Sequence, residues 1–162
     1  MRKAGFPPVV SPDTRLLLLG SLPGEASLAA GRYYAHPRNQ FWQLVGAVIG
    51  RDLVALDYEL RLQALLNAGI GLWDTVQSAH REGSLDSAIR EESHNSLHDL
   101  CAQLPALRAI GFNGAKSARI GSKLLAGSPY MLVSLPSSSP AYAAMNLAGK
   151  QARWMELGQF LK

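Results

Sequence analysis

Four short segments of the sequence carry small and polar residues of the kind that bind a polar ligand. They are residues 20–24 (GSLPG), 74–75 (DT), 113–116 (NGAK) and 136–140 (PSSSP). Their side chains are mostly amides and hydroxyls, and their glycines let a ligand approach backbone N–H groups. They contain no strong nucleophile, no general base and no cluster of metal ligands. We therefore expect chemistry that rests on hydrogen bonds, with no metal and no cofactor.

A fifth segment, residues 32–42 (RYYAHPRNQFW), interleaves aromatic rings with arginines. Aromatic rings can stack on an unpaired base and arginines can hold phosphates, so the pattern suits nucleic acid. Phe41 and Trp42 begin an apolar helical stripe and are expected in the core. Tyr33, Tyr34 and Asn39 precede that stripe and are expected to face a cleft. The alternative is a loop whose aromatic residues all belong to the core.

The serine tract lies between Pro136 and Pro140, after an apolar run and before a long helical pattern that contains Trp154 and Leu157. A rigid loop at the start of a helix offers hydroxyls and N–H groups to a phosphate. A flexible linker is the alternative. Taken alone, residues 20–24 fit an ordinary strand-to-helix turn better than a ligand-binding loop.

Two histidines and the single cysteine are residue types that often bind metals or react, but their surroundings in the sequence do not predict such a site. His94 and His98 are four residues apart, as in a zinc-binding helix, but the glutamate of an HExxH motif and a third ligand are missing. We therefore expect no zinc site. Cys101 lies in an apolar helical pattern and is expected to be a core residue.

The elements that would position the polar segments alternate between strands and helices. Four apolar runs predict strands buried on both faces of a parallel sheet; they span residues 15–20, 69–74, 107–112 and 130–135. Helical spacing predicts helices over residues 39–49, 58–66, 95–104, 114–125 and 141–161, with Asn95 as a cap. This order predicts an α/β fold, a three-layer α/β/α sandwich with a central, mostly parallel four-stranded sheet. Ligands bind beyond the carboxyl ends of such strands, where the polar segments would meet.

Length and composition limit the class of protein. The 162 residues, 48% of them hydrophobic, suit a single domain over residues 1–162 with one core. No apolar run is long enough for a membrane helix or a signal peptide, and a single cysteine excludes a disulfide framework. We expect a cytosolic protein. The net charge of +4 favours nucleic acid only modestly.

Read in order, the polar segments resemble the motifs of the uracil-DNA glycosylase superfamily. Gly20-Ser21-Leu22-Pro23-Gly24 followed by Tyr34-Ala35-His36-Pro37-Arg38-Asn39-Gln40-Phe41-Trp42 is similar to the first motif of the mismatch-specific uracil/thymine DNA glycosylases. The pairing of Gly-Ser-x-Pro-Gly with Tyr-Tyr-Ala-His-Pro-Arg-Asn is more similar still to the hypoxanthine-DNA glycosylase branch. Weaker matches follow at residues 72–74, 112–116 and 135–141, so the resemblance covers roughly residues 15–157.

This resemblance implies a monofunctional DNA glycosylase. Such an enzyme flips a deaminated base out of double- or single-stranded DNA and hydrolyses its N-glycosidic bond, which leaves an abasic site. We expect hypoxanthine as the preferred base and uracil as a second candidate. The expected partner is DNA rather than a membrane, and the expected form is a monomer in the cytoplasm, associated with the nucleoid through its DNA.

Two positions depart from the wider superfamily. Many relatives place Asp or Asn where this chain has Leu22, to position the attacking water, and His or Asn where it has Ser137, to donate to the leaving base. The resemblance to the hypoxanthine branch implies that Asn39 takes over the catalytic role and that Tyr34 stacks under the flipped base. Asn113 is our candidate for reading the base, because an amide can donate to a keto oxygen and accept from a ring N–H.

The full set of expected site residues follows from these assignments. We expect Asn39 and Ser137 at catalytic positions. The expected base-binding residues are Tyr34, Asn113, Asp74, Gly20 and Ser21. The expected contacts to the DNA backbone are Arg32, Arg38, Lys116, Ser138 and Ser139.

The expected mechanism is largely dissociative. An amide cannot deprotonate water, but the Asn39 oxygen can accept a hydrogen bond from water and hold it facing the anomeric carbon. The leaving base then carries negative charge, which hydrogen-bond donors stabilise. A lysine beginning a helix is better explained as a surface residue than as a Schiff-base nucleophile, so we expect Lys116 not to cut the strand. Three alternatives remain: a G:U/T mismatch-specific uracil enzyme, a lesion-binding module without activity, and an unrelated hydrolase of small nucleotides.

Overall fold

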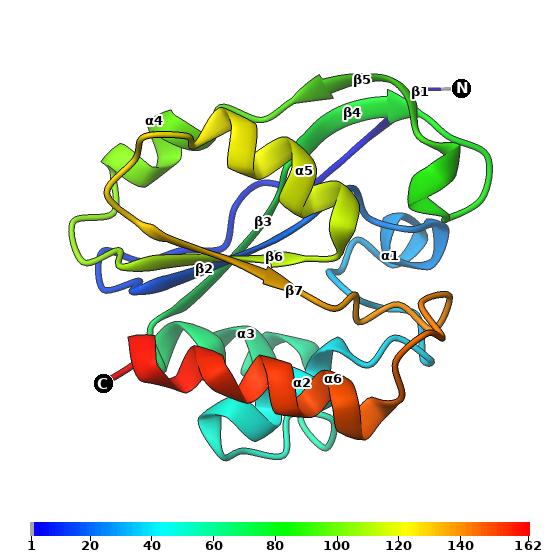
Figure 1. Ribbon diagram of the computed structural model, residues 1–162. Coiled ribbons are helices and arrows are strands. Elements are labelled where there is room, and N and C mark those ends of the chain that lie inside the picture. Colours follow the sequence, from blue (N-terminus) through cyan, green and yellow to red (C-terminus); the bar gives the residue numbers. More distant parts are fainter. Residues whose placement is uncertain (1) are drawn as a thin grey trace.

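The computed structural model describes residues 2–162, and its centre is a parallel four-stranded sheet (Figure 1). The strands lie in the order β3-β2-β6-β7, and each neighbouring pair is parallel. Their bounds are β2 (Leu16–Gly20), β3 (Ile70–Asp74), β6 (Ala109–Asn113) and β7 (Met131–Leu135). The predicted strands are therefore confirmed to within two residues at each end.

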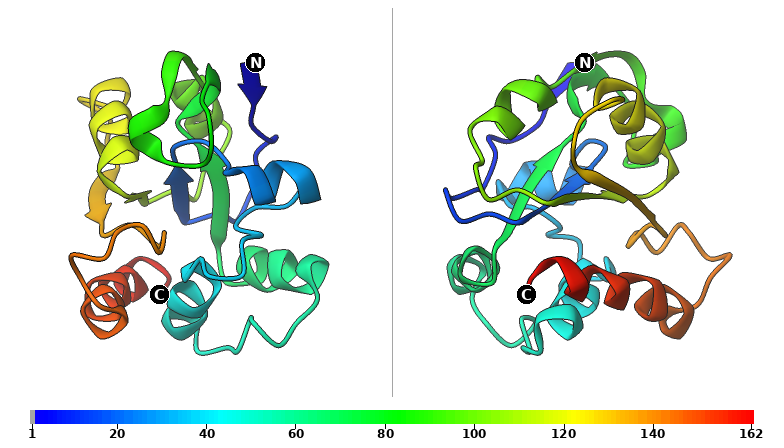
Figure 2. Two further views of the ribbon diagram at one scale, coloured as in Figure 1. Left: turned by 90° about the vertical axis from the view of Figure 1, so that its right-hand side faces the viewer. Right: turned by 60° about the vertical axis from the view of Figure 1, so that its left-hand side comes forward.

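Helices cover both faces of this sheet, which confirms the three-layer α/β/α architecture (Figure 2). On one face lie α2 (Phe41–Ile49), α3 (Tyr58–Asn67) and α6 (Leu147–Trp154), the last followed by the 3-10 helix η2 (Met155–Phe160). On the other lie α4 (Leu97–Ala102) and α5 (Ala115–Leu124). Within residues 2–162, no helix is both long enough and apolar enough to cross a bilayer.

Strand β2 shows why a continuous apolar run suits the centre of the sheet. Leu16 and Leu18 pack with the α2, α3 and α6 layer, whereas Leu17 and Leu19 pack with the α4 and α5 layer. All four are fully buried. Because successive side chains of a strand point to opposite faces, each layer receives two leucines.

Strand β7 corrects the expectation of burial on both faces. It forms the edge of the sheet, with β6 as its only neighbour among residues 2–162, and Met131 and Leu132 are 60% and 36% exposed. An apolar run therefore identified the strand correctly but did not distinguish an edge strand from a central one.

A second, antiparallel sheet was not predicted. It has the order β1-β4-β5 and consists of β1 (Arg2–Ala4), β4 (Val76–His80) and β5 (Arg90–His94), with the 3-10 helix η1 (Asp86–Ala88) between the last two. These strands are polar and partly exposed, so they lack the apolar run that marks the central sheet. The short helix α1 (Glu25–Ala30) was also missed.

Several helix boundaries differ from expectation, and two of them have a clear cause in asparagine side chains. The predicted helix over residues 141–161 begins only at Leu147, because Asn146 caps α6 by accepting a hydrogen bond from the Gly149 N–H at 2.8 Å. Asn95 does not cap α4: its side chain instead donates to the backbone carbonyl of Asp74 at 2.8 Å, and Ser96 occupies the cap position. The asparagine that looked like a helix cap therefore links α4 to the end of β3.

Candidate active site

The carboxyl ends of the parallel strands bring the predicted polar segments together at one edge of the sheet. In the strand register, Gly20 at the end of β2 lies opposite Asp74 at the end of β3. Asn113 at the end of β6 lies opposite Leu135, which leads into the serine loop, residues 136–140. Residues far apart in the sequence thus become neighbours through strand pairing alone.

A hydrogen-bond network joins three of these segments through Ser138. The Asn113 amide nitrogen donates to Ser138 Oγ at 2.9 Å, and Ser138 Oγ donates to Asn39 Oδ1 at 2.8 Å. The Ser138 backbone N–H donates back to Asn113 Oδ1 at 2.8 Å. Ser138 is buried, and its hydroxyl lies between two asparagines, while its contact to the DNA backbone stays a prediction.

Asn39 is held rigidly just before helix α2. Besides the bond from Ser138, its Oδ1 accepts the Phe41 backbone N–H at 3.0 Å, and a parallel link runs from the Gln40 N–H to the Ser138 carbonyl at 2.9 Å. The Asn39 oxygen therefore carries two intramolecular hydrogen bonds, whereas its amide nitrogen makes none within residues 2–162. These two bonds fix the plane of the amide, but they also occupy both lone pairs of the oxygen that was expected to accept a hydrogen bond from water, so the free group of Asn39 is its amide N–H.

Tyr34 forms a flat platform beside this network. Its ring stacks on Phe41 with 3.9 Å between centroids and 11° between planes, and its hydroxyl accepts from the Asn113 amide at 3.3 Å. Its φ of 52° is unusual for a residue with a side chain. Burial, followed by the nearby Asp74 carboxyl, raises the pKa of the Tyr34 phenol above its ordinary value. One face of the ring is covered by Phe41, which leaves the other face as the candidate stacking surface.

Tyr33 is largely buried, although it contributes to the lining of a pocket together with Arg32, Tyr34 and Tyr58. It is buried, its hydroxyl donates to the Pro7 carbonyl at 3.0 Å, and its ring packs edge-on against Phe6. The residue belongs to the core with Phe41 and Trp42, which were expected there.

Only glycine fits at position 20, because the side chains of Asp74 and Tyr34 lie close to its Cα. A Cβ at this position would lie 2.6 Å from Asp74 Oδ1 and 3.0 Å from the Tyr34 hydroxyl. Both contacts are shorter than normal van der Waals separations, so any larger residue would push the carboxyl or the phenol away. The glycine thus lets Tyr34 and Asp74 come together across the end of β2.

Asp74 is the strongest electrostatic feature of the site. It is 3% exposed, and its Oδ2 makes no hydrogen bond within residues 2–162. Burial and, to a smaller extent, the neighbouring Asp86 raise the pKa of the Asp74 carboxyl to about 7, although Arg81 opposes the shift. A buried polar group without a partner is costly, and such groups mark candidate functional sites.

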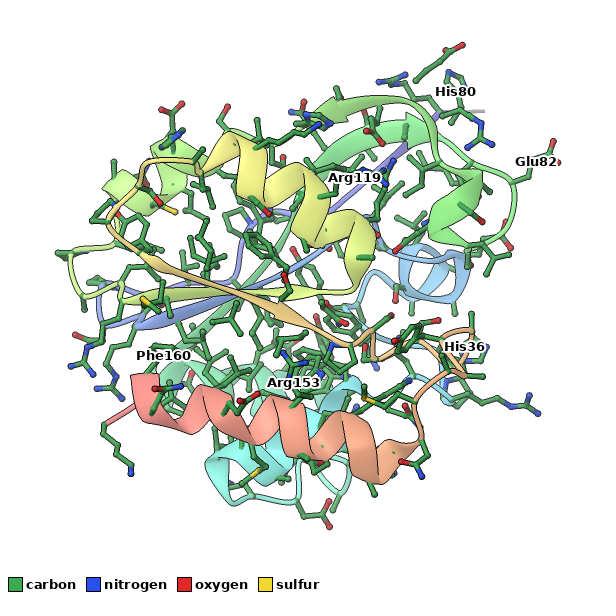
Figure 3. The ribbon with its side chains drawn as sticks, in the orientation of Figure 1. His36, His80, Glu82, Arg119, Arg153 and Phe160 are labelled. Carbon is green, nitrogen blue, oxygen red and sulfur yellow. The ribbon has the colours of Figure 1, made fainter. Side chains whose placement is uncertain are left out.

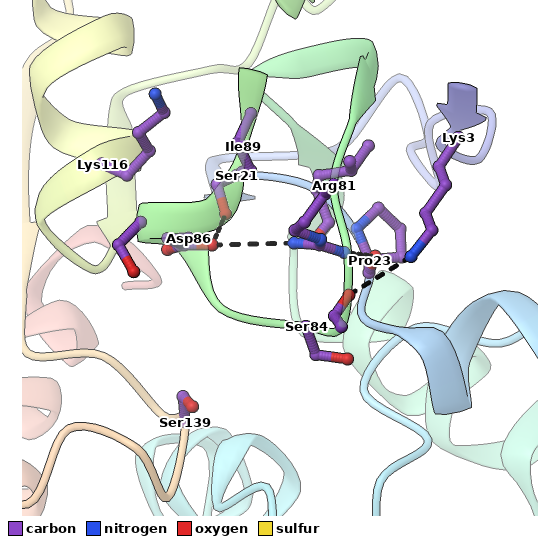
Figure 4. Close-up of polar contacts among 12 residues, drawn as sticks. Lys3, Ser21, Pro23, Arg81, Ser84, Asp86, Ile89, Lys116 and Ser139 are labelled. Carbon is purple, nitrogen blue, oxygen red and sulfur yellow. Dashed lines mark hydrogen bonds and ion pairs between the residues drawn. The ribbon is translucent and has the colours of Figure 1, made fainter. Parts of the chain in front are cut away.

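Asp86 and Arg81 form a cluster with Ser21 that sequence reasoning missed (Figure 4). Ser21 Oγ donates to Asp86 Oδ1 at 2.5 Å, and Arg81 Nη1 lies 4.0 Å from the same oxygen. The buried Arg81 also donates to the backbone carbonyls of Leu22 and Pro23. Nothing in the spacing of the sequence marks this cluster, because it arises only when the β4–β5 connection folds over the loop after β2.

Leu22 occupies the position where many relatives carry the Asp or Asn that positions water. It is buried in a small apolar cluster with Val76, Ala79, Ile89 and Ile120. The apolar side chain of Leu22 therefore packs in the interior and cannot hold a water molecule.

The other two serines of the loop shape its backbone. Ser137 Oγ accepts the Ser139 N–H at 3.1 Å, and Ser139 Oγ accepts the Ala141 N–H at 3.2 Å. Ser137 packs against Gly114, whose φ is +99°. The tract is therefore a hydrogen-bonded turn, and Ser137 makes no hydrogen bond to Asn39.

The basic residues predicted to contact DNA differ in their exposure and in their partners. Arg32 and Arg38 are exposed, with the Arg32 guanidinium 5.4 Å from the Tyr58 ring centroid. Lys116 begins α5 as expected, but its ammonium lies 2.7 Å from Glu92 Oε2. The two histidines do not share a helix, because His94 ends β5 and His98 lies in α4. Cys101 is a core residue, as expected.

Comparison with known proteins decides the family. The model of the uracil DNA glycosylase superfamily matches residues 7–158. This chain belongs to that superfamily. The superfamily member described here is similar to the hypoxanthine DNA glycosylases of Methanosarcina barkeri and Methanosarcina acetivorans. It is 41% identical to the first over 156 residues, which cover 96% of this chain and 98% of the relative. It is 45% identical to the second over 141 residues, which cover 87% and 89%.

A solved structure agrees with this assignment. The superfamily fold of this chain matches the solution NMR structure of a candidate uracil DNA glycosylase from Methanosarcina acetivorans with a TM-score of 0.89. The two chains are 40% identical, and the match covers 99% of each. The glycosylase fold and its strand order are therefore shared over essentially the whole chain.

Proposed function

We propose that this glycosylase removes hypoxanthine from DNA by hydrolysing its N-glycosidic bond and leaving an abasic site. The observation that carries the proposal is the buried, unpaired carboxyl oxygen of Asp74 next to the Tyr34 platform. The names of the two Methanosarcina relatives support the same base. We further propose that the protein acts as a monomer on DNA in the cytoplasm.

A neutral Asp74 has the hydrogen-bonding groups that hypoxanthine requires. Deamination of adenine creates a keto oxygen beside a ring N–H. A protonated carboxyl offers an O–H to the first and a carbonyl oxygen to the second. Because its proton can sit on either oxygen, the reverse pattern of adenine must be excluded by the fixed groups around the carboxyl. A pKa of about 7 keeps much of Asp74 neutral at neutral pH. The neutral form also avoids repulsion with the negative charge that develops on the leaving base.

Asn113 remains the alternative reader of the base. Its amide has the same donor and acceptor pair, but in the DNA-free protein both ends are engaged with Ser138 and Tyr34. The longest of these bonds, 3.3 Å to the Tyr34 hydroxyl, is the one that a keto oxygen would most easily replace. Substituting Asp74 and Asn113 separately by alanine distinguishes a reader of the base from a residue that holds the serine loop.

We propose that Asn39 orients the attacking water through the free N–H groups of its amide, while Ser138 fixes the plane of that amide. The superfamily position that usually activates water is the buried Leu22, and Asn39 is the polar side chain of the first motif that we propose takes its place. Because no strong base is present, the glycosidic bond must break largely before water attacks. Arg32 and Arg38 are proposed to contact phosphates that flank the flipped nucleotide.

Excision from matched duplexes tests the proposal. Duplexes containing one deoxyinosine, one deoxyuridine or only normal bases are incubated with excess enzyme, and abasic sites are cleaved by hot alkali. We expect hypoxanthine to be released fastest, uracil slowly and adenine not at all. Faster release of uracil would assign the protein to the mismatch uracil branch, since uracil shares the keto and N–H pair. Release of neither base, with binding retained, would identify a lesion-binding module.

A further inference from the structure

Lys150 is a buried cation that the mechanism above does not use. It lies in α6 and is 1% exposed. No carboxylate lies within 4 Å of its ammonium among residues 2–162, and burial lowers the pKa of this lysine. Removing a charge from water without an opposite charge nearby is costly, so the position needs a reason.

The contacts of the ammonium connect the two segments that build the active site. Lys150 Nζ donates to Gln40 Oε1 at 2.9 Å and to the Ser139 carbonyl at 3.2 Å. Gln40 directly follows Asn39, and Ser139 directly follows Ser138. Lys150 thus links the same two segments that the bond between Asn39 and Ser138 links.

Packing alone does not account for a lysine here. Trp154 and Leu157 continue the buried face of the same helical segment, and both are fully buried apolar residues. A methionine at position 150 would fill similar space without the cost of burying a charge. In the DNA-free protein the ammonium also lies 5.5 Å from the centroid of the Tyr142 ring, a cation–π contact that offsets part of this cost without supplying a negative charge.

A DNA phosphate would supply the opposite charge that these contacts lack. The serine loop lies at the edge where the substrate must bind, and its Ser139 carbonyl already contacts the ammonium. A phosphodiester arriving at this loop would bring negative charge close to Lys150, in a setting where solvent screens little.

We propose that Lys150 is a positioning residue whose buried charge holds the serine loop against Asn39 and attracts a DNA phosphodiester to that loop. The proposal rests on the proposed function for its substrate. It predicts that the charge, and not only the hydrogen bonds, contributes to DNA affinity and to the rate of excision.

Four variants test the proposal. Lys150→Met removes the charge and the hydrogen bonds, Lys150→Gln removes the charge but keeps a donor, and Lys150→Arg keeps the charge. Arg153→Met is the matched control, because it removes an exposed cation one turn further along α6 (Figure 3). Each variant is tested for its affinity for a duplex with a tetrahydrofuran abasic analogue at several salt concentrations. Its single-turnover release of hypoxanthine and its melting temperature are measured in parallel.

We expect Lys150→Met and Lys150→Gln to weaken binding and slow excision about tenfold, and Lys150→Arg to stay within threefold of wild type. The slope of log Kd against log salt should become shallower in the two neutral variants, by up to the value of about 0.9 for one phosphate. Arg153→Met should change affinity and rate less than twofold.

Equal affinity and rate in Lys150→Gln and Arg153→Met would overturn the proposal. So would a loss that the melting curves explain entirely by unfolding in both neutral variants. Binding to the abasic analogue needs no base excision, so this arm still decides the role of Lys150 if the wild-type protein fails to release hypoxanthine.

Discussion

The two sides of the active site differ in whether their buried polar groups have hydrogen-bond partners. On the side of β6 and the serine loop, the amide of Asn113 and the hydroxyl of Ser138 are fully paired with each other and with their neighbours. On the side of β2 and β3, Asp74 keeps an unpaired oxygen and shares its surroundings with a second acid, Asp86. The first side is complete without DNA, whereas the second leaves a hydrogen-bonding position for a ligand.

This difference indicates that the two sides of the site have different functions. Paired networks fix geometry, because every rotation of a side chain breaks a hydrogen bond. Unpaired buried groups reward a ligand that satisfies them and penalise one that does not, by about 1–3 kcal/mol per group. We therefore assign orientation of water to the paired side and discrimination between bases to the unpaired side.

The largest effect should follow from removing Asn39. Asn39→Ala should lower the single-turnover rate of hypoxanthine release by about 100-fold or more and leave the fold intact, because no other residue of the first motif can hold the water. The exposed Asn67→Ala in α3 is the matched control. A variant that retains more than about a tenth of the rate, a difference of only ~1.4 kcal/mol, would contradict the assignment.

The pH dependence of excision should report the protonation of Asp74. If the neutral carboxyl reads the base, the wild-type rate should fall about tenfold between pH 6 and pH 8, since the pKa is about 7. Asp86, Arg81, Tyr33 and Tyr34 are the titratable groups whose charges influence Asp74 or are influenced by it. Asp74→Asn imitates the neutral acid at every pH.

The rate of Asp74→Asn should therefore stay nearly constant over this range, and single-turnover rates at closely spaced pH values provide the measurement. Asp86→Asn serves as the comparison, because it removes a neighbouring charge and should move the falling limb to lower pH without abolishing it. A wild-type profile that is flat between pH 6 and pH 8 would refute the role of a neutral Asp74.

A moderate effect is expected when the bridge between the two asparagines is removed. Ser138→Ala leaves the Asn39 oxygen and the Asn113 nitrogen each without one partner, so the rate should fall several-fold and the free energy of unfolding should drop by about 1–3 kcal/mol. Chemical denaturation and single-turnover kinetics measure both. Ser122→Ala, on the exposed face of α5, should change neither, and equal behaviour of the two variants would show that the bridge is unimportant.

The smallest effect concerns stability. The pKa of Asp74 is higher in the folded protein than in the unfolded chain, so the folded state binds this proton more tightly. Its contribution to stability is complete below the unfolded value near 4 and is lost as pH rises through about 7. The melting temperature of wild type relative to Asp74→Asn should therefore decline from pH 5 to pH 8. A difference that grows with pH would mean that the carboxyl is stabilised as an anion.

The sequence predicted the central sheet well because its signals are local. Each apolar run contains its own evidence for a buried strand, and the residues that follow it mark the edge where Gly20, Asp74 and Asn113 meet. The second sheet escaped prediction because its strands are polar and depend on partners from the chain terminus. Arg81 escaped because its burial comes from carbonyl groups 59 and 58 residues earlier in the chain.

Lys150 is an intermediate case between these two. It lies four residues before Trp154 and seven before Leu157, so helical spacing alone places a charged residue on an apolar face. The sequence shows that this position is unusual. It does not show that the Lys150 ammonium donates to the Gln40 side chain and the Ser139 carbonyl. Sequence can therefore mark such a residue as unusual, while only the fold shows what it contacts.

The central position of β2 also has a consequence for how the chain folds as it is synthesised. Its four leucines emerge from the ribosome early, yet their strand partners lie more than 50 residues later in β3 and more than 90 residues later in β6. Until both arrive, the most apolar segment of the chain has no sheet to join. Such long-range pairing slows folding and prolongs the exposure of apolar surface. Nascent chains that stall before β6 should therefore depend most on chaperones.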